Sequence, residues 1–187
     1  LEKNQSVLIH AGAGGVGHVA IQIAKGLGAR VATTISGKEK AEFAQSLGAE
    51  YLINYQKKDF VDAVLDWTDG KGVDVVFDTV GNKTFCHSFG AAKIYGKVVT
   101  LLEGICDSNA VKVAKMRNLS VIYELMLTPM HLGMHKQRVA QRRILEEATR
   151  RIEAGEVSVK VTEIFSLNDA AKAHHLIENG HMTGKIV

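Results

Sequence analysis

Short apolar runs alternate along this chain with apolar residues at helical spacing. The first run, Val7 to Ile9, has the pattern of a strand buried on both faces. The apolar residues that follow it recur on one predicted helix face: Val16, Val19, Ala20, Ile23, Ala24 and Leu27. Gly28 stands where a glycine commonly ends a helix. The opening of the chain is therefore predicted to form a strand, a turn and a helix.

The same alternation continues to the end of the chain. Further strands are predicted at Arg30 to Ile35, Tyr51 to Asn54, Val73 to Asp78, Lys97 to Leu102, Leu119 to Leu125, Lys160 to Phe165 and Gly184 to Val187. Helices are predicted at Lys38 to Leu47, Asp59 to Trp67, Asn82 to Ala92, Gln137 to Ala154 and, capped by Asn168, Asn168 to Glu178. This order indicates an α/β fold, a Rossmann-type doubly wound parallel six-stranded sheet with helices on both faces, followed by a C-terminal α/β segment.

A glycine-rich turn joins the first strand to the first helix. It reads Gly12-Ala13-Gly14-Gly15-Val16-Gly17 and matches the pattern G-x-G-x-x-G. Gly12 would allow a sharp reversal, Gly14 would let a pyrophosphate approach the backbone, and Gly17 would let the helix pack closely on the sheet. A purely structural glycine turn is the alternative. The strand before the turn and the helix after it favour dinucleotide binding.

The end of the second strand bears on the choice of cofactor. Proteins that bind NAD carry an acidic residue there, which contacts the ribose hydroxyls. This chain has Ser36 at that position, with Lys38 and Lys40 just after it. A hydroxyl and ammonium groups suit a 2′-phosphate, so NADP(H) is favoured over NAD(H). The alternative is that both lysines are solvated residues at a helix start.

Composition narrows the class of protein further. The chain has 187 residues, 46% hydrophobic and 23% charged, with a net charge of +3, which is too slight to indicate nucleic-acid binding. Cys86 and Cys106 lack C-x-x-C spacing and cannot form a zinc tetrad. Two inert thiols in a reducing cytosol are expected, with a disulfide as the alternative. No membrane-length apolar run or signal peptide is visible, so a cytoplasmic protein without a membrane partner is predicted.

The histidines do not form a convincing metal site. His131 and His135 have the spacing of ligands on one helix face, but Pro129 and Gly133 weaken any helix there. A second group lies near the end of the chain, at His174, His175 and His181. Adjacent helical residues point in different directions, so structural or solvated roles are favoured and no metal site is predicted. Asp78, at a strand end, is interpreted as either a helix-cap acceptor or a group that orients backbone or ribose.

Several longer motifs resemble one superfamily. HAGAGGVGHVAIQIAKGLGARV, GAEYLINYQKKDF, GKGVDVVFDTVG and TGKIV occur in this order, and together they resemble the medium-chain dehydrogenase/reductase superfamily, most of all its zinc-independent quinone oxidoreductase branch. The resemblance covers nearly the whole chain. It implies an NADPH-binding Rossmann domain at residues 1–130, normally preceded by a GroES-like catalytic domain that is absent here. Residues 131–187 would hold the long helix and a segment that returns to that domain, which leaves the run 184–187 without its usual strand partners.

The resemblance also assigns individual residues. Ala13, Gly15 and Val16 match the backbone that meets the pyrophosphate. The 2′-phosphate positions are matched by Ser36, Lys40 and Tyr55, and the nicotinamide side by Thr79, Val80, Gly81 and Leu101. The chain departs from the pattern at Leu102 and Glu103, where relatives often have a small residue.

The activity implied by this resemblance is NADPH-dependent reduction of a quinone or of the C=C bond of an α,β-unsaturated carbonyl. The groups that polarise the substrate would lie in the absent domain, so no catalytic residue is predicted, and this chain alone is expected to bind cofactor weakly and not to turn over. The alternatives are a zinc-dependent alcohol dehydrogenase of the same superfamily and a non-enzymatic cofactor sensor or structural protein. The apolar strand Leu119 to Leu125 would form an exposed sheet edge. In the resembling enzymes this edge pairs across a homodimer, which is predicted here too.

Overall fold

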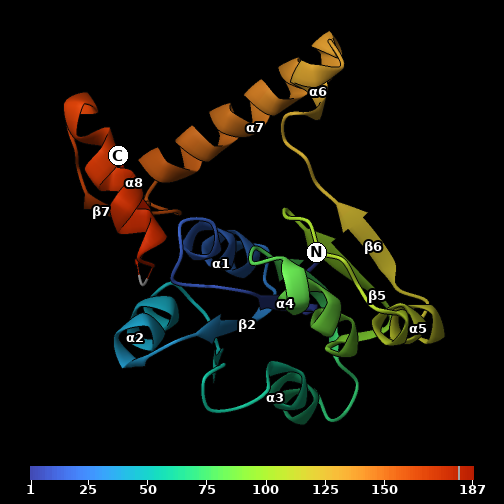
Figure 1. Ribbon diagram of the computed structural model, residues 1–187. Coiled ribbons are helices and arrows are strands. Elements are labelled where there is room, and N and C mark those ends of the chain that lie inside the picture. The colour runs from blue at the N-terminus through green and yellow to red at the C-terminus, as the bar shows by residue number, and fades with distance from the viewer. Residues whose placement is uncertain (181) are drawn as a thin grey trace.

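A six-stranded parallel sheet forms the centre of the computed structural model, which describes residues 1–180 and 182–187 (Figure 1). The strand order is β3-β2-β1-β4-β5-β6. The strands are β1 (Ser6–Ile9), β2 (Arg30–Ile35), β3 (Tyr51–Asn54), β4 (Val73–Asp78), β5 (Ala92–Thr100) and β6 (Ser120–Tyr123). The order reverses between β1 and β4, so the carboxyl ends of these two strands flank the crevice where such sheets bind ligands.

Helices cover both faces of the sheet, with α1 (Gly17–Gly26) and α2 (Lys38–Ser46) on one face and α3 (Phe60–Trp67), α4 (Asn82–His87) and α5 (Ser108–Met116) on the other. The remaining helical elements are the 3₁₀ turn η1 (Ser88–Gly90), α6 (Thr128–His131), α7 (His135–Glu153), the 3₁₀ turn η2 (Leu167–Asp169) and α8 (Ala170–Glu178). The predicted fold class is confirmed.

Two apolar cores lie on opposite faces of the sheet because successive strand residues point to opposite sides. In β1, Val7 and Ile9 face α1 and α2, where they pack with Ile21 and Ala44. Leu8, between them, faces α3 and η1 and has no exposed surface. Burial on both faces explains the unbroken apolar run of β1.

The sequence pattern missed α5. This helix packs only partly buried alanines against the core and buries none of its residues fully, so its apolar signal is weak. The start of α5 could have been predicted from Asp107, an aspartate at the N-cap position, whose side chain accepts a hydrogen bond of 2.8 Å from the N–H of Ala110.

The two cysteines correct a prediction. Cys86 in α4 and Cys106 in the segment after β5 form a disulfide, with Cα atoms 5.3 Å apart, so the expectation of two inert thiols is wrong. The residues are 20 positions apart in sequence and meet because β5 returns the chain to the edge of the sheet where α4 begins.

The C-terminal segment forms a small unit of its own. Its strands β7 (Val161–Glu163) and β8 (Lys185–Ile186) pair in parallel. The run 184–187 therefore has a strand partner within this chain. The helix predicted from Asn168 begins instead as the 3₁₀ turn η2, which contains Asn168. The N-cap residue of α8 is Asp169, and no side chain caps the helix, so the capping role predicted for Asn168 is wrong.

The long helix α7 stands away from the sheet and buries none of its residues (Figure 1). Ion pairs lie along its exposed surface: Glu147 pairs with both Arg150 and Arg151, each at 2.8 Å, and Glu146 pairs with Arg142 at 2.7 Å. Among residues 1–180 and 182–187, no helix has both the length and the apolar character needed to cross a lipid bilayer.

Candidate functional site

The glycine turn leaves β1 and enters α1 without room for side chains at two positions. A Cβ built on Gly12 would lie 2.0 Å from Oγ1 of Thr33 on β2. A Cβ on Gly17 would lie 2.2 Å from the carbonyl oxygen of Ala11. These contacts explain why neither position takes a side chain: Gly12 lies against β2, and Gly17, the first residue of α1, lies against the backbone just after β1.

The turn presents unpaired backbone donors at the positive end of α1. In the described part of the chain, the N–H groups of Ala13, Gly15 and Val16 donate to no carbonyl or side chain. The helix has no side-chain cap and no acidic residue in its first turn. Such an end favours an anion, because free N–H groups and the helix dipole both point toward it. The arrangement fits the pyrophosphate of a dinucleotide.

His10, which directly follows β1 and precedes the glycine turn, is buried and hydrogen-bonded at both ring nitrogens. It was not identified from the sequence as a site residue. Its Nε2 donates to Oγ of Ser88 at 2.9 Å, because that hydroxyl itself donates to the carbonyl of Thr84. Its Nδ1 accepts from the hydroxyl of Thr34 at 3.3 Å, and the oxygen of that hydroxyl accepts from the N–H of Ala11. Burial lowers the pKa of His10 to about 4, against a smaller raising effect of Asp78. The imidazole is therefore neutral at pH 7.

His18 joins the glycine turn to the C-terminal segment and was also missed. Its Nδ1 donates to the carbonyl of Gly14 at 2.8 Å, since a carbonyl only accepts. Its Nε2 accepts from the N–H of Lys160 at 3.2 Å. The sequence could have drawn attention to His18 as a histidine on the buried face of a helix. It could not have shown its partner, because Lys160 lies 142 residues away in sequence.

The three residues predicted for the 2′-phosphate lie at one edge of the sheet. Ser36 directly follows β2, and Tyr55 directly follows β3, where its N–H donates to the carbonyl of Ile35 at 3.3 Å. Lys40 lies in the first turn of α2 and is half-buried. Lys38 instead forms an exposed pair with Glu42 at 3.7 Å. No carboxylate stands at the tip of β2.

The predicted nicotinamide-side residues gather around one buried carboxylate. Asp78 accepts from the N–H groups of Val80 and Gly81, at 3.1 and 3.0 Å, and from the Thr100 hydroxyl. Asp78 therefore orients the backbone before α4 and does not cap this helix, whose N-cap residue Gly81 has no side-chain cap. The Thr79 hydroxyl donates to the carbonyl of His10 at 2.8 Å.

Leu101 joins the same group, because its N–H donates to the carbonyl of Asp78 at 3.3 Å. The next residue, Leu102, is the one at which the chain departs from the family pattern. It packs against Gly81, where an added Cβ would lie 2.8 Å from the Leu102 Cβ.

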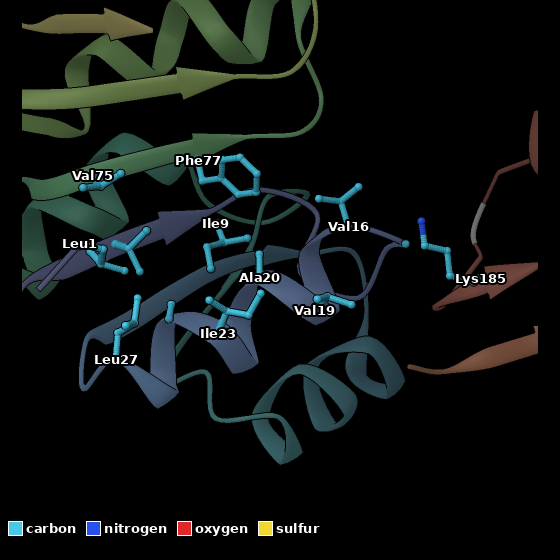
Figure 2. Close-up of a pocket in the computed structure, with 13 residues that line it drawn as sticks. Leu1, Ile9, Val16, Val19, Ala20, Ile23, Leu27, Val75, Phe77 and Lys185 are labelled. Atoms are coloured by element: carbon cyan, nitrogen blue, oxygen red, sulfur yellow. The ribbon is translucent and has the colours of Figure 1, made fainter. Parts of the chain in front are cut away.

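An apolar groove of about 550 Å³ runs along α1 and ends at the glycine turn (Figure 2). The predicted stripe of α1 lines this groove, with Val16, Ile23 and Leu27 each about 40% exposed, and only its Ala24 is also buried in the core. Val75 and Phe77 of β4 form the opposite wall. The other buried residues of α1 are Gly17, His18 and Ile21, which lie outside the predicted stripe.

The described residues bring no metal site together. Among residues 1–180 and 182–187, no group of three or more His, Cys, Asp or Glu is placed to hold a metal ion. Both cysteines are taken up in the disulfide. His181, part of one predicted histidine cluster, lies outside the described residues.

The sheet order, the glycine turn and the unpaired N–H groups together define a Rossmann-type domain. Residues 47–187 match the family described as zinc-binding dehydrogenase, and the chain belongs to this family. The residues described above do not fit zinc, since they offer no set of ligands.

Relatives with curated descriptions are similar over nearly all of this chain. A 2-haloacrylate reductase of Burkholderia sp. is 35% identical over 97% of this chain and 54% of its own length. A quinone oxidoreductase of Pseudomonas aeruginosa is 32% identical over 100% of this chain and 57% of its own. The chain thus spans about half the length of these relatives.

Solved structures agree. The quinone oxidoreductase of Escherichia coli complexed with NADPH has a TM-score of 0.87 and 29% identity, over 100% of this chain and 58% of the other. The 2-haloacrylate reductase structure has a TM-score of 0.82 and 32% identity, over 99% of this chain and 57% of the other. The similarity to this branch of the superfamily is confirmed.

Proposed function

We propose that this chain is the NADPH-binding domain of an oxidoreductase that transfers hydride to a quinone or an α,β-unsaturated carbonyl. The observation that carries the proposal is the set of unpaired N–H groups of Ala13, Gly15 and Val16 at the start of α1. They provide donors for a pyrophosphate at the positive end of the helix dipole.

Each group of residues has a distinct part in this proposal. The turn 12–17 binds the pyrophosphate, while Ser36, Lys40 and Tyr55 surround the 2′-phosphate through a hydroxyl, an ammonium group and a phenol. Thr79, Val80, Gly81 and Leu101 hold the nicotinamide side, on a loop that Asp78 fixes by its hydrogen bonds. NADPH, when bound, supplies the hydride. We assign no catalytic residue to this chain.

The substrate class rests on the relatives, whose descriptions are quinone oxidoreductase and 2-haloacrylate reductase. A quinone and a haloacrylate share an electron-poor C=C bond conjugated to a carbonyl or carboxyl group, which suits hydride transfer. Because the chain spans about half of each relative, we place the groups that contact the substrate in a separate catalytic domain of the GroES-like kind.

Residues 1–130 form the nucleotide-binding domain in this proposal, and residues 131–187 return to the catalytic domain. The support is the uncovered apolar surface of α7, where Ile144 and Leu145 are each 68% exposed. Side chains of this kind are normally buried against another surface.

We further propose a homodimer through β6 and work in the cytoplasm. The strand β6 ends the sheet at one edge, where Ile122 and Tyr123 are exposed. A strand at a sheet edge offers unpaired backbone groups to a second strand.

The disulfide between Cys86 and Cys106 argues against a cytoplasmic location, because cytosolic thiols keep most cysteines reduced. Counting free thiols in protein taken directly from cells tests that location.

Calorimetric titration of the chain with NADPH and NADH tests the cofactor assignment. We expect tighter binding of NADPH, by about tenfold, since one charge-assisted contact to a phosphate contributes on this scale. Lys40→Ala should remove most of the preference, and Ser36→Asp should reverse it through repulsion of the 2′-phosphate. Lys38→Ala is the matched control and should leave it unchanged. Equal affinities for the two cofactors in the unaltered chain would contradict the assignment to NADPH.

A further inference from the structure

The disulfide ends the loop that would hold the nicotinamide. This loop, residues 101–107, runs from the end of β5 to the N-cap of α5. It begins at Leu101, whose N–H donates to the carbonyl of Asp78, and near its end Cys106 is bonded to Cys86 of α4. One covalent bond thus joins the nicotinamide side of the proposed site to a neighbouring helix.

Apart from the disulfide, the second half of this loop is attached to α4 by weaker contacts. The carbonyl of Glu103 accepts from the N–H of Asn82 at 3.0 Å. Gly104 packs against the ring of Phe85, whose Cδ1 would lie 2.8 Å from a Cβ built on the glycine. Ile105 is fully exposed and adds no apolar packing. The covalent bond is therefore the strongest of these restraints on the loop.

The two sulfur atoms lie where a small thiol can reach them. Cys86 and Cys106 are both only partly buried. Cys86 lines a cavity of about 600 Å³ between α4 and α5, and Cys106 lines another of about 730 Å³ between α5 and β6. Lys83 lines the first cavity too, and its ammonium group favours the thiolate that thiol–disulfide exchange releases at Cys86. Exposed disulfides of this kind are more readily reduced than buried ones.

We propose that Cys86 and Cys106 form a reversible redox switch that sets the affinity of this chain for the nicotinamide end of NADPH. The co-reactant is a dithiol. It reduces the S–S bond through a mixed disulfide, becomes a disulfide itself, and passes its two protons to the two cysteine sulfur atoms. The inference rests on the proposed function, because it requires the nicotinamide to bind beside Leu101.

Reduction should loosen one end of the cofactor site and leave the other in place. In the oxidised chain the loop 101–107 is already ordered when the nicotinamide binds. In the reduced chain the loop must be ordered by the cofactor, and the lost conformational entropy opposes binding. The glycine turn 12–17 and the residues Ser36, Lys40 and Tyr55 lie on other elements, which the disulfide does not join. The switch therefore acts on the nicotinamide and not on the adenosine half of NADPH.

Calorimetric titration of the chain before and after reduction with dithiothreitol tests this inference. NADPH should bind about fivefold more weakly to the reduced chain. Adenosine 2′,5′-bisphosphate, which lacks the nicotinamide, should bind both forms equally. Cys86→Ser with Cys106→Ser is the matched control and should bind NADPH like the reduced chain, whether or not dithiothreitol is present. Cys86→Ala with Cys106→Ala repeats this control with apolar replacements, and reoxidation of the unaltered chain should restore its affinity.

Amide hydrogen exchange follows the loop itself, without any cofactor. The N–H groups of Asn82 and Leu101 donate to carbonyls on either side of the loop contact, and both should exchange about tenfold faster after reduction. The N–H of Gly12, which donates to the carbonyl of Thr34, reports any general loosening of the fold and should change less.

The outcomes separate this inference from the proposed function. If the oxidised chain binds NADPH and reduction does not weaken that binding, the switch is wrong and the proposed function stands. If reduction weakens NADPH and the bisphosphate by the same factor, the disulfide only stabilises the fold, which also overturns the inference. Weaker binding of NADPH without faster exchange at Asn82 and Leu101 would overturn it too. If the oxidised chain does not bind NADPH, both proposals fail.

Discussion

His10 shows how a single buried side chain can set the pH dependence of this fold. It is 1% exposed, and burial lowers its pKa from 6.5 to about 4. Both ring nitrogens already have partners that suit the neutral form. Between the two pKa values the unfolded chain binds a proton that the folded chain does not. The stability from neutral His10 is thus present above pH 6.5 and is lost as the pH falls toward 4.

Urea unfolding at pH 7 and pH 5 should therefore show a loss of about 2 kcal/mol attributable to His10. The comparison is with His10→Gln, which cannot titrate and should lose that much less over the same interval. Equal losses in the two proteins would show that His10 is charged in the folded chain or has an ordinary pKa there.

Residues with local roles could be predicted from the sequence, and residues with distant partners could not. The roles of Gly12 and Gly17 follow from the turn that contains them. His18 contacts a residue 142 positions away in sequence, which no spacing along the chain reveals. Asp78 was found by its place at a strand end, but its acceptor role needed the loop around it.

At the scale of elements, the disulfide joins two segments that would flank the nicotinamide. It links α4, which follows the turn at Gly81, to the segment after β5 that contains Leu101. The N–H of Asn82 also donates to the carbonyl of Glu103, at 3.0 Å. The crosslink therefore limits the freedom of this loop in the unfolded chain and its movement in the folded one.

Removal of the disulfide by Cys86→Ser with Cys106→Ser should cost about 3 kcal/mol of unfolding free energy, given a closed loop of this length. Chemical unfolding with and without a dithiol reductant measures it. The unaltered chain should lose stability on reduction, and the double variant should not respond. A chain whose stability is the same in both conditions would show that the crosslink contributes nothing.

The order of elements was predictable because each strand and most helices carry a strong periodic signal. The failures have physical reasons: α5 buries little apolar surface, and the start of β5 includes Tyr95 at a φ of +61°, which breaks the strand pattern. The stripe of α1 has helical spacing, but it lines a groove, and only Ala24 of it is buried in the core. Amphipathic spacing identifies a helix without telling which apolar face the sheet covers.

For the whole molecule, the exposed edge of β6 is the surface on which the proposed dimer depends. Sedimentation of the chain at high concentration should show a dimer, and Ile122→Lys should return it to a monomer by placing a charge on the edge. Ile144→Lys on α7, which is also exposed, is the control and should leave the dimer intact. Only monomer in the unaltered chain would count against pairing through this edge.

Amide chemical shifts test most directly whether the turn from Gly12 to Gly17 binds the pyrophosphate of NADPH. On titration of the ¹⁵N-labelled chain with NADPH, we predict the largest changes at the N–H groups of Ala13, Gly15 and Val16. These are the donors that have no partner among the described residues. Unchanged shifts at these three amides, with changes elsewhere or none at all, would contradict the claim.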